Sequence, residues 1–113
     1  MKSRREGKII NISSLASEIA LPFQPHYTAS KFALEGLIEA LRMEVKQFNI
    51  KVMNINPGDF KTELTANRLF SASLSDDYKD KFDYVMKYCE ENEQSGSDPI
   101  EIAHLAELSL IHI

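Results

Sequence analysis

Two short, isoleucine-rich runs separated by a long helical pattern constrain the fold of this chain most strongly. The runs cover residues 8–13 and 50–56, and the first does not alternate cleanly between apolar and polar side chains. The first run therefore predicts a strand buried on both faces, as in a parallel sheet, and the second run predicts another strand. From about residue 27 to residue 48, apolar positions recur every three or four residues, which predicts an amphipathic helix. A strand, a crossover helix and a parallel strand form a right-handed βαβ unit, so we expect an α/β fold.

Two further helices are expected after this unit. Residues 76–93 form an acidic amphipathic pattern, and a last apolar pattern begins near Ile100 and continues to the end of the chain. Asp98 or Ser97 is the expected N-cap of the last helix, with Pro99 in its first position. Before the crossover helix, we expect residues 14–26 to form a loop, because Pro22 and Pro25 disfavour an early helical start.

Three polar side chains at the start of the crossover helix suggest acid–base chemistry. Tyr27 and Lys31 are four residues apart, so they share one helical face, and a nearby ammonium favours the phenolate form of a phenol. Such a pair can exchange a proton near neutral pH. Ser14, thirteen residues before Tyr27, supplies a hydroxyl that can donate to or accept from a reacting oxygen. The trio suits alcohol–carbonyl interconversion, although a Tyr-x-x-x-Lys pair by itself is more commonly an amphipathic surface pair.

The βαβ unit is expected to bring these residues to one edge of the sheet. Ser14 follows the first strand, Tyr27 and Lys31 open the returning helix, and residues 57–62 follow the second strand. Open α/β sheets bind ligands at the carboxyl ends of their strands. For Pro57 and Gly58 taken alone, a simple turn after a strand is the alternative interpretation.

Three motifs in a fixed order connect the chain to a known family. They are N-I-S-S at residues 11–14, Y-x-A-S-K at residues 27–31 and P-G-x-x-x-T at residues 57–62. With these motifs the sequence resembles the short-chain dehydrogenase/reductase family in its short single-domain form. The resemblance implies an NAD(P)-dependent oxidoreductase that interconverts an alcohol and a ketone or aldehyde by hydride transfer.

The resemblance also implies a role for each matching residue. Tyr27 would be the general acid/base, and Lys31 would favour its phenolate form and hold the nicotinamide ribose hydroxyls. Ser14 would orient the reacting oxygen, with Ser13 as the less favoured choice. The cofactor, NAD or NADP, would also contact the segment after the second strand: backbone groups would lie against the nicotinamide carboxamide and a threonine hydroxyl near the pyrophosphate, which corresponds to Pro57, Gly58, Phe60 and Thr62.

Several features of the family are missing from the chain. None of its 4 glycines forms a G-x-G pair, so a phosphate-cradling glycine-rich turn is absent. The asparagine that completes the catalytic group and the residue that selects NAD or NADP are also missing. We therefore expect residues 1–113 to be the carboxyl-terminal part of one Rossmann-like NAD(P)-binding domain, a βαβ unit plus two further helices that lacks the amino-terminal cofactor-binding half of the doubly wound parallel sheet. Alone, this part is expected to show no measurable NAD(P)H binding or dehydrogenase activity.

Two alternatives to an oxidoreductase remain. The first is a cofactor-free interaction or dimerisation module, because the helix face opposite the apolar stripe carries small residues: Ala29, Ala33, Gly36 and Ala40. The family pairs this helix across a dimer axis, so a homo-oligomer through helix 27–48 is expected. The second alternative, a sugar-nucleotide epimerase, shares the tyrosine and lysine but is disfavoured by the P-G-x-x-x-T segment.

Composition excludes several other classes of protein. The net charge of −4, without an extended basic face, argues against nucleic-acid binding. No apolar run approaches the roughly 18 residues of a membrane span, and the first apolar run is too interrupted for a signal peptide. The single Cys89 allows neither a disulfide framework nor a cysteine metal site, and a cytoplasmic location fits. Apolar Phe60, Leu64 and Leu69 indicate a small or lipophilic alcohol or ketone as substrate.

Overall fold

The computed structural model describes residues 1–70 and 74–112 and forms two compact units. Unit 1 comprises Met1–Gly58 and Ile102–Ile113, and unit 2 comprises Asp59–Glu101. The residues expected to carry acid–base chemistry all belong to unit 1. The segment expected to contact the cofactor is divided, with its first two residues in unit 1 and the others in unit 2.

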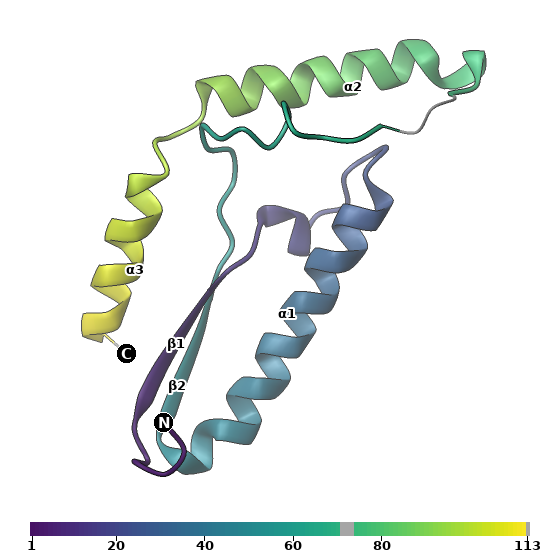
Figure 1. The fold of residues 1–113 in the computed structure, drawn as a ribbon. Coiled ribbons are helices and arrows are strands. Elements are labelled where there is room, and N and C mark those ends of the chain that lie inside the picture. The colour runs from purple at the N-terminus through teal and green to yellow at the C-terminus, as the bar shows by residue number, and fades with distance from the viewer. Residues whose placement is uncertain (71–73, 113) are drawn as a thin grey trace. The chain divides into compact units, whose positions relative to one another are not determined.

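Unit 1 is built on the expected βαβ unit (Figure 1). Strands β1 (Gly7–Ile12) and β2 (Ile50–Ile55) pair in parallel, in a register that runs from Gly7 opposite Ile50 to Ile12 opposite Ile55. Helix α1 (Pro25–Val45) connects them, preceded by the short 3-10 helix η1 (Leu15–Ser17) and followed by η2 (Lys46–Phe48). The α/β class and the parallel pairing are confirmed. Each strand ends one residue earlier than expected.

The boundaries of α1 differ from the expected helix 27–48 at both ends. Pro25 occupies the first turn, where a missing N–H costs nothing, so this proline begins the helix and does not delay it. At the other end, the chain tightens into η2, and Asn49 closes it in the left-handed conformation with a φ of 55°. Asparagine is among the few residues that adopt this conformation readily, which explains why β2 follows at once.

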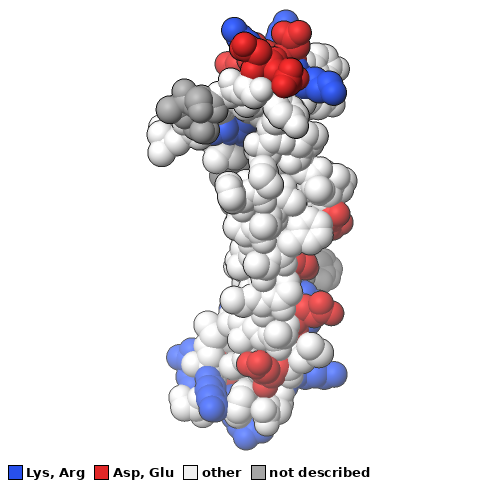
Figure 2. Space-filling view, turned by 90° about the vertical axis from the view of Figure 1, so that its right-hand side faces the viewer, with Lys and Arg blue, Asp and Glu red and all other residues white. Residues whose placement is uncertain are grey.

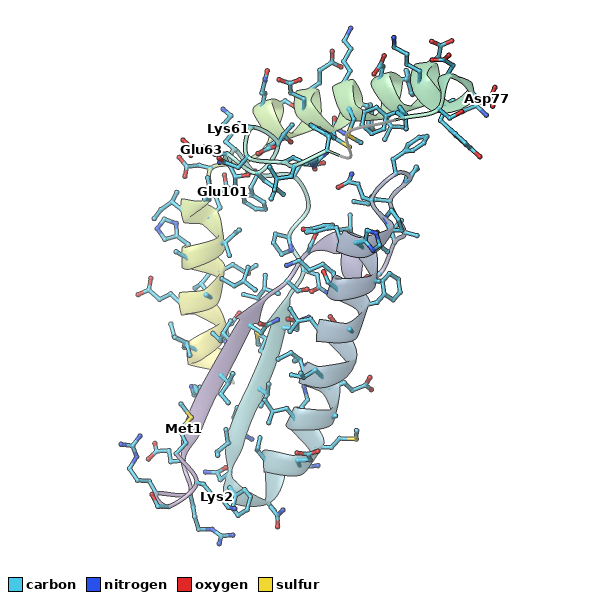
Figure 3. The ribbon with its side chains drawn as sticks, turned by 45° about the vertical axis from the view of Figure 1, so that its right-hand side comes forward. Met1, Lys2, Lys61, Glu63, Asp77 and Glu101 are labelled. Carbon is cyan, nitrogen blue, oxygen red and sulfur yellow. The ribbon has the colours of Figure 1, made fainter. Side chains whose placement is uncertain are left out.

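The core of unit 1 lies between α1 and one face of the sheet. Ile38 of α1 packs with Ile50 and Val52 of β2, surrounded by half-buried Ile9, Leu34, Leu41, Val45 and Phe48. Figure 3 shows side chains of α1 extending towards the two strands. The expectation that the first strand is buried on both faces is wrong, because Ile12 of β1 is 49% exposed. In a two-stranded sheet, β1 has one paired edge, and α1 covers only one face.

Unit 2 is held together by pairing of its two ends. Phe60 forms an isolated parallel bridge with Ser97, and the Ser97 carbonyl accepts a 3.0 Å hydrogen bond from the amide of Lys61. Gly96 allows this approach, because a Cβ there would lie 2.5 Å from the carbonyl oxygen of Asp59. Between these ends lies α2 (Asp76–Ser95), two residues longer than expected. Acidic side chains gather at its start (Figure 2), where the helix dipole favours them.

The last helix, α3 (Ile100–His112), begins as the cap signal indicated. The carboxylate of Asp98 accepts a 2.9 Å hydrogen bond from the amide of Ile100, and Pro99 stands immediately before the helix. Within unit 1, Lys8 of β1 donates to the carbonyl of Leu110 near the end of α3. In the described parts of the chain, no helix is long and apolar enough to cross a membrane.

Candidate active site

Ser14 lies just beyond the carboxyl end of β1, on backbone that continues the strand pairing. The amide of Ser13 donates to the carbonyl of Ile55, and the amide of Leu15 donates to the carbonyl of Pro57, both at 2.8 Å. The Ser14 hydroxyl oxygen accepts a 3.1 Å hydrogen bond from the amide of Ala16 and so caps η1. This bond uses an oxygen lone pair, and the hydroxyl proton stays available for another acceptor.

The neighbouring Ser13 differs from Ser14 in its surroundings. Its hydroxyl is buried and has no hydrogen-bond partner among the described residues, whereas Ser14 is half-buried. A half-buried hydroxyl at the strand end is easier for a small molecule to approach. The structure therefore favours Ser14 over Ser13 as the serine of a reaction site.

Tyr27 and Lys31 occupy the first two turns of α1 and are both half-buried. The ammonium of Lys31 lies over the phenol ring of Tyr27, 5.5 Å from the ring centroid. At this distance a cation interacts favourably with the face of an aromatic ring. In the same region, the hydroxyl of Thr28 accepts from the amide of Leu21 at 3.2 Å and ties the preceding loop to the start of α1.

Pro57 and Gly58 end the first segment of unit 1. The Pro57 carbonyl is engaged by Leu15, as described above, so its position follows that of the Ser14 backbone. Gly58 is exposed, and a Cβ on this residue would meet no atom within 4 Å. Packing in this structure therefore gives no reason for a glycine at position 58.

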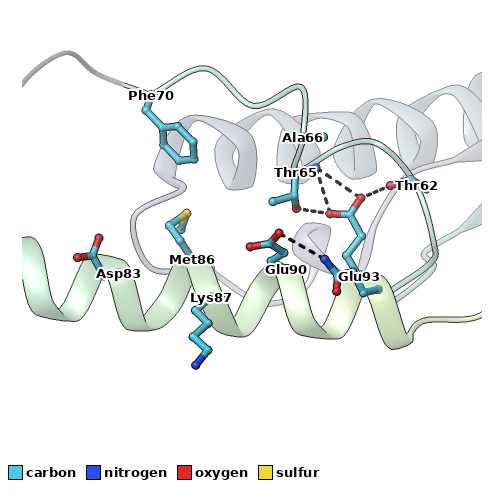
Figure 4. Close-up of a pocket in the computed structure, with 10 residues that line it drawn as sticks. Thr62, Thr65, Ala66, Phe70, Asp83, Met86, Lys87, Glu90 and Glu93 are labelled. Carbon is cyan, nitrogen blue, oxygen red and sulfur yellow. Dashed lines mark hydrogen bonds between the residues drawn. The ribbon is translucent and has the colours of Figure 1, made fainter.

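In unit 2, Thr62 is held by a buried carboxylate that the sequence did not single out (Figure 4). Glu93 of α2 is 9% exposed and accepts hydrogen bonds from the hydroxyl of Thr62 at 2.6 Å and from the amides of Leu64 and Thr65, each at 3.0 Å at its shortest. The hydroxyl of Thr65 donates to the same carboxylate. Glu93 thus gathers the donors of the 62–65 segment onto one side chain.

The hydrogen bonds to Glu93 decide its protonation. Burial raises the pKa of the Glu93 carboxyl, but the donors from Thr62, Thr65 and Leu64 outweigh burial, and the pKa lies below its usual range. The carboxylate is therefore ionised at neutral pH. It also engages the hydroxyl proton of Thr62, the group that the family resemblance would direct towards a phosphate.

A cavity of about 480 Å³ lies beside this carboxylate in unit 2. Phe70 and Met86 provide apolar surface, and Figure 4 shows Lys87 pointing away from the 62–65 segment. The guanidinium of Arg68 donates to the sulfur of Met86 at 3.2 Å. Among the residues that the structure describes, no group of three or more histidine, cysteine or acidic side chains could hold a metal ion.

A chain of hydrogen-bonded amide and carboxylate side chains in unit 1 was also not predicted from the sequence. Asn11 of β1 donates to Asn54 of β2 at 2.6 Å, and Asn54 donates to Asn56 at 2.9 Å. Asn56 donates to Glu18 at 2.8 Å and to Glu35 at 3.2 Å. The available signal was the recurrence of asparagine at the ends of two otherwise apolar strands. Glu93 lacked such a signal, since it is one of several acidic residues in α2.

Comparisons with known proteins establish the family of this chain. The profile of the family described as short chain dehydrogenase matches residues 1–71. The 3-ketodihydrosphingosine reductase of Bacteroides thetaiotaomicron is 46% identical over 101 residues, which cover 88% of this chain and 38% of the relative. Human retinol dehydrogenase 8 is 41% identical over 76 residues, or 67% of this chain and 24% of the relative.

A solved structure has a similar fold. The crystal structure of a short-chain dehydrogenase from Streptomyces avermitilis superimposes with a TM-score of 0.79 and 32% sequence identity, over 97% of this chain and 40% of that protein. Fold and motifs thus define a Rossmann-like α/β oxidoreductase segment. The chain belongs to the short-chain dehydrogenase family, and it spans about two fifths of the length of its relative from Bacteroides.

Proposed function

We propose that this chain carries the acid–base group of an NAD(P)-dependent oxidoreductase that interconverts an alcohol and a ketone or aldehyde. The observation that carries the proposal is the ammonium of Lys31, 5.5 Å from the centre of the Tyr27 ring, at the carboxyl end of a parallel βαβ unit. The phenol of Tyr27 carries a transferable proton, and the ammonium of Lys31 lies beside it at the start of the same helix.

Each residue of the trio has a distinct part in this proposal. A bound nicotinamide supplies or accepts the hydride at the substrate carbon. During reduction, Tyr27 donates its phenolic proton to the carbonyl oxygen, and during oxidation it removes the proton from the alcohol. Ser14 donates its free hydroxyl proton to the same oxygen and orients it. Lys31 stabilises the phenolate of Tyr27 and binds the ribose hydroxyls.

The proposed cofactor contacts fit the structure unequally. Tyr27, Lys31, Pro57 and Gly58 offer polar side chains or accessible backbone in unit 1, as the nicotinamide end of NAD or NADP requires. In unit 2, Phe60 is fixed by its bridge to Ser97, and Thr62 directs its hydroxyl proton to Glu93. A phosphate contact from Thr62 therefore needs that hydrogen bond to open.

We further propose that residues 1–113 form the carboxyl-terminal part of a single Rossmann-like domain in the cytoplasm. Relatives named 3-ketodihydrosphingosine reductase and retinol dehydrogenase 8 support a lipophilic alcohol or ketone as the substrate. The 113 residues alone are not expected to bind NAD(P)H measurably, since they contain no G-x-G turn to cradle the phosphates.

A second proposal is self-association through α1, either in the enzyme or as the function of a cofactor-free module. The outward face of α1 carries exposed Ala29, Ala33 and Gly36, and a Cβ at Gly36 would meet no atom within 4 Å. Phe32 and Leu37 of the same helix are also exposed. Small residues allow another helix to approach closely, and the neighbouring apolar side chains would be buried in such a contact.

Replacing Tyr27 by phenylalanine tests the enzymatic proposal in the complete enzyme. The change removes one proton donor and leaves the packing nearly intact, so kcat should fall roughly 10²–10⁴-fold while the cofactor Kd hardly changes. Tyr84→Phe is the matched control, because Tyr84 is 73% exposed on α2 and should keep full activity. A Tyr27→Phe enzyme with most of its activity would remove Tyr27 from the reaction.

A further inference from the structure

We propose that Asn56 is a positioning residue that fixes Ser14 relative to Tyr27 and Lys31, acting through Glu18 and Glu35. The inference rests on the proposed oxidoreductase function, because it assigns a purpose to the geometry of the same three residues. It concerns unit 1 alone, and every contact that carries it lies within Met1–Gly58.

The backbone of Asn56 lies beside Ser14 at the end of the sheet, because the register of β1 and β2, continued past the strand ends, places Asn56 opposite Ser13 and Pro57 opposite Ser14. Ile55 and Pro57, its two neighbours, accept the hydrogen bonds from Ser13 and Leu15, the two neighbours of Ser14. These two backbone hydrogen bonds therefore flank both Ser14 and Asn56. A displacement of the Asn56 backbone would move Ser14 with it.

The side chain of Asn56 extends this frame to the helix that carries Tyr27 and Lys31. Its Nδ2 donates to Oε1 of Glu18 at 2.8 Å and to Oε2 of Glu35 at 3.2 Å. Glu18 is the C-cap of η1, the short helix that Ser14 caps at its other end. Glu35 lies four residues after Lys31 in α1 and therefore on the same face, one turn further along.

The orientation of the Asn56 amide is fixed by the asparagines behind it. Asn54 donates to Oδ1 of Asn56 at 2.9 Å, which leaves Nδ2 of Asn56 facing the two carboxylates. Asn54 also donates to the same Oε2 atom of Glu35, and its own Oδ1 accepts from Asn11 at 2.6 Å. Both strands, η1 and α1 are therefore joined through one set of side-chain hydrogen bonds.

This arrangement needs a neutral donor at position 56. Glu18 and Glu35 present two acceptor groups that cannot hydrogen-bond to each other while both are ionised, and the amide of Asn56 supplies the N–H groups that satisfy both. An aspartate of the same shape would offer oxygen where nitrogen is needed and would add a third negative charge. Ser14 would then be displaced relative to Tyr27 and Lys31, although all three side chains would still be present.

The test is Asn56→Asp in the complete enzyme. We expect kcat to fall about 100-fold, the loss typical of a misplaced reacting group, with KM for the cofactor within about two-fold of the unchanged enzyme. Asn49→Asp is the matched control, since Asn49 is exposed at the opposite end of β2 and should keep its activity.

The double variant Asn56→Asp with Glu35→Gln reverses the direction of the hydrogen bond between positions 56 and 35. The glutamine amide at position 35 can then donate to the carboxylate at position 56. At least a ten-fold recovery of kcat is expected, and a merely structural role would not predict recovery from a second substitution. Glu18→Ala is a milder variant at an exposed position; it should lower kcat several-fold at unchanged Tm. The proposal is overturned if Asn56→Asp keeps its kcat, if it loses activity only in proportion to its folded fraction, or if the double variant shows no recovery.

Failure of the proposed function gives a different result. In that case Tyr27→Phe would leave the activity unchanged, whatever Asn56→Asp does. If Tyr27→Phe is inactive and Asn56→Asp is fully active, the oxidoreductase proposal stands and only the role of Asn56 is rejected.

Discussion

In unit 1, Ser14 is flanked by two backbone hydrogen bonds between neighbouring strand ends, whereas in unit 2 Thr62 depends on one charged side chain, Glu93. The difference extends to burial. In the described part of the chain, the buried apolar residues all belong to unit 1: Ala16, Ile38, Ile50, Val52 and Ile55. In unit 2, by contrast, a charged residue, Glu93, is buried.

The comparison indicates a different level of rigidity for each unit. A parallel ladder with a buried apolar core opens only when much of its unit unfolds. A segment held by one carboxylate can open locally, at the cost of a few hydrogen bonds. We therefore expect the acid–base group to be fixed and the Thr62 segment to be adjustable.

The largest expected effect is a loss of enzyme activity, and it should follow a substitution in unit 1 but not one in unit 2. In the complete enzyme, Lys31→Ala should lower kcat by roughly 10²-fold or more and weaken cofactor binding, because the ammonium acts on both the phenol and the ribose. Thr62→Val should leave kcat nearly unchanged and weaken the cofactor Kd by about ten-fold, the value of one charged hydrogen bond. Steady-state kinetics with cofactor titration measures both. Equal losses of kcat would contradict the assignment of different roles to the two units.

Shortening an apolar side chain should cost more stability in unit 1 than in unit 2. Ile38→Ala removes a buried side chain of unit 1 and should lower its free energy of unfolding by about 2–5 kcal/mol. Met86→Ala removes a half-buried side chain of unit 2 and should cost roughly half as much. Native-state hydrogen exchange of β2 and α2 amides reports each unit separately. A larger loss from Met86→Ala would show that unit 2 has the stronger core.

Acidification should affect unit 2 through Glu93. Because its pKa is lower in the folded state, the ionised carboxylate stabilises unit 2 above the unfolded pKa, and this contribution is lost as pH falls through the folded pKa. The amide resonances of Leu64 and Thr65 should shift together over that range in NMR spectra, and Glu93→Gln should abolish the shared shift. The amide of Leu15, which bonds to a backbone carbonyl in unit 1, serves as the control. A shared shift that persists in Glu93→Gln would assign it to another group.

The smallest effect on stability is expected on the helix surfaces. Ala33→Arg on α1 and Ser95→Arg on α2 are both exposed changes and should each alter the free energy of unfolding by less than about 0.5 kcal/mol. Only Ala33→Arg should reduce self-association in analytical ultracentrifugation, because it places a long charged side chain on the smooth face of α1. An unchanged oligomeric state in Ala33→Arg would reject α1 as the interface.

Much of unit 1 was predictable because its signals are local. The apolar runs around Ile9 and Val52 predicted the two strands, and the spacing of Leu34, Ile38 and Leu41 predicted which face of α1 is buried. The four-residue spacing of Tyr27 and Lys31 likewise predicted that the ammonium would lie near the phenol ring. These features depend on backbone periodicity, which a sequence displays directly.

The errors arose where the outcome depends on neighbouring elements. The pattern around Ile12 predicted burial on both faces, but burial requires a covering element, and α1 covers one face. Pro25 was expected to delay the helix, yet the same proline suits a first turn once the preceding loop is fixed. For Glu93, nothing local distinguishes it from the other acidic residues of α2.

The sequence by itself determined the parallel βαβ unit, the family and the order of Ser14, Tyr27 and Lys31, because strand and helix periods and motif spacings are properties of the chain alone. Only the tertiary structure decided that Asn56 faces Glu18 and Glu35, and that Glu93 takes the hydroxyl proton of Thr62. The physical reason is that a hydrogen bond depends on the distance and direction between two groups. For residues 21 to 38 positions apart, as in these pairs, only the packing of the intervening elements sets these quantities.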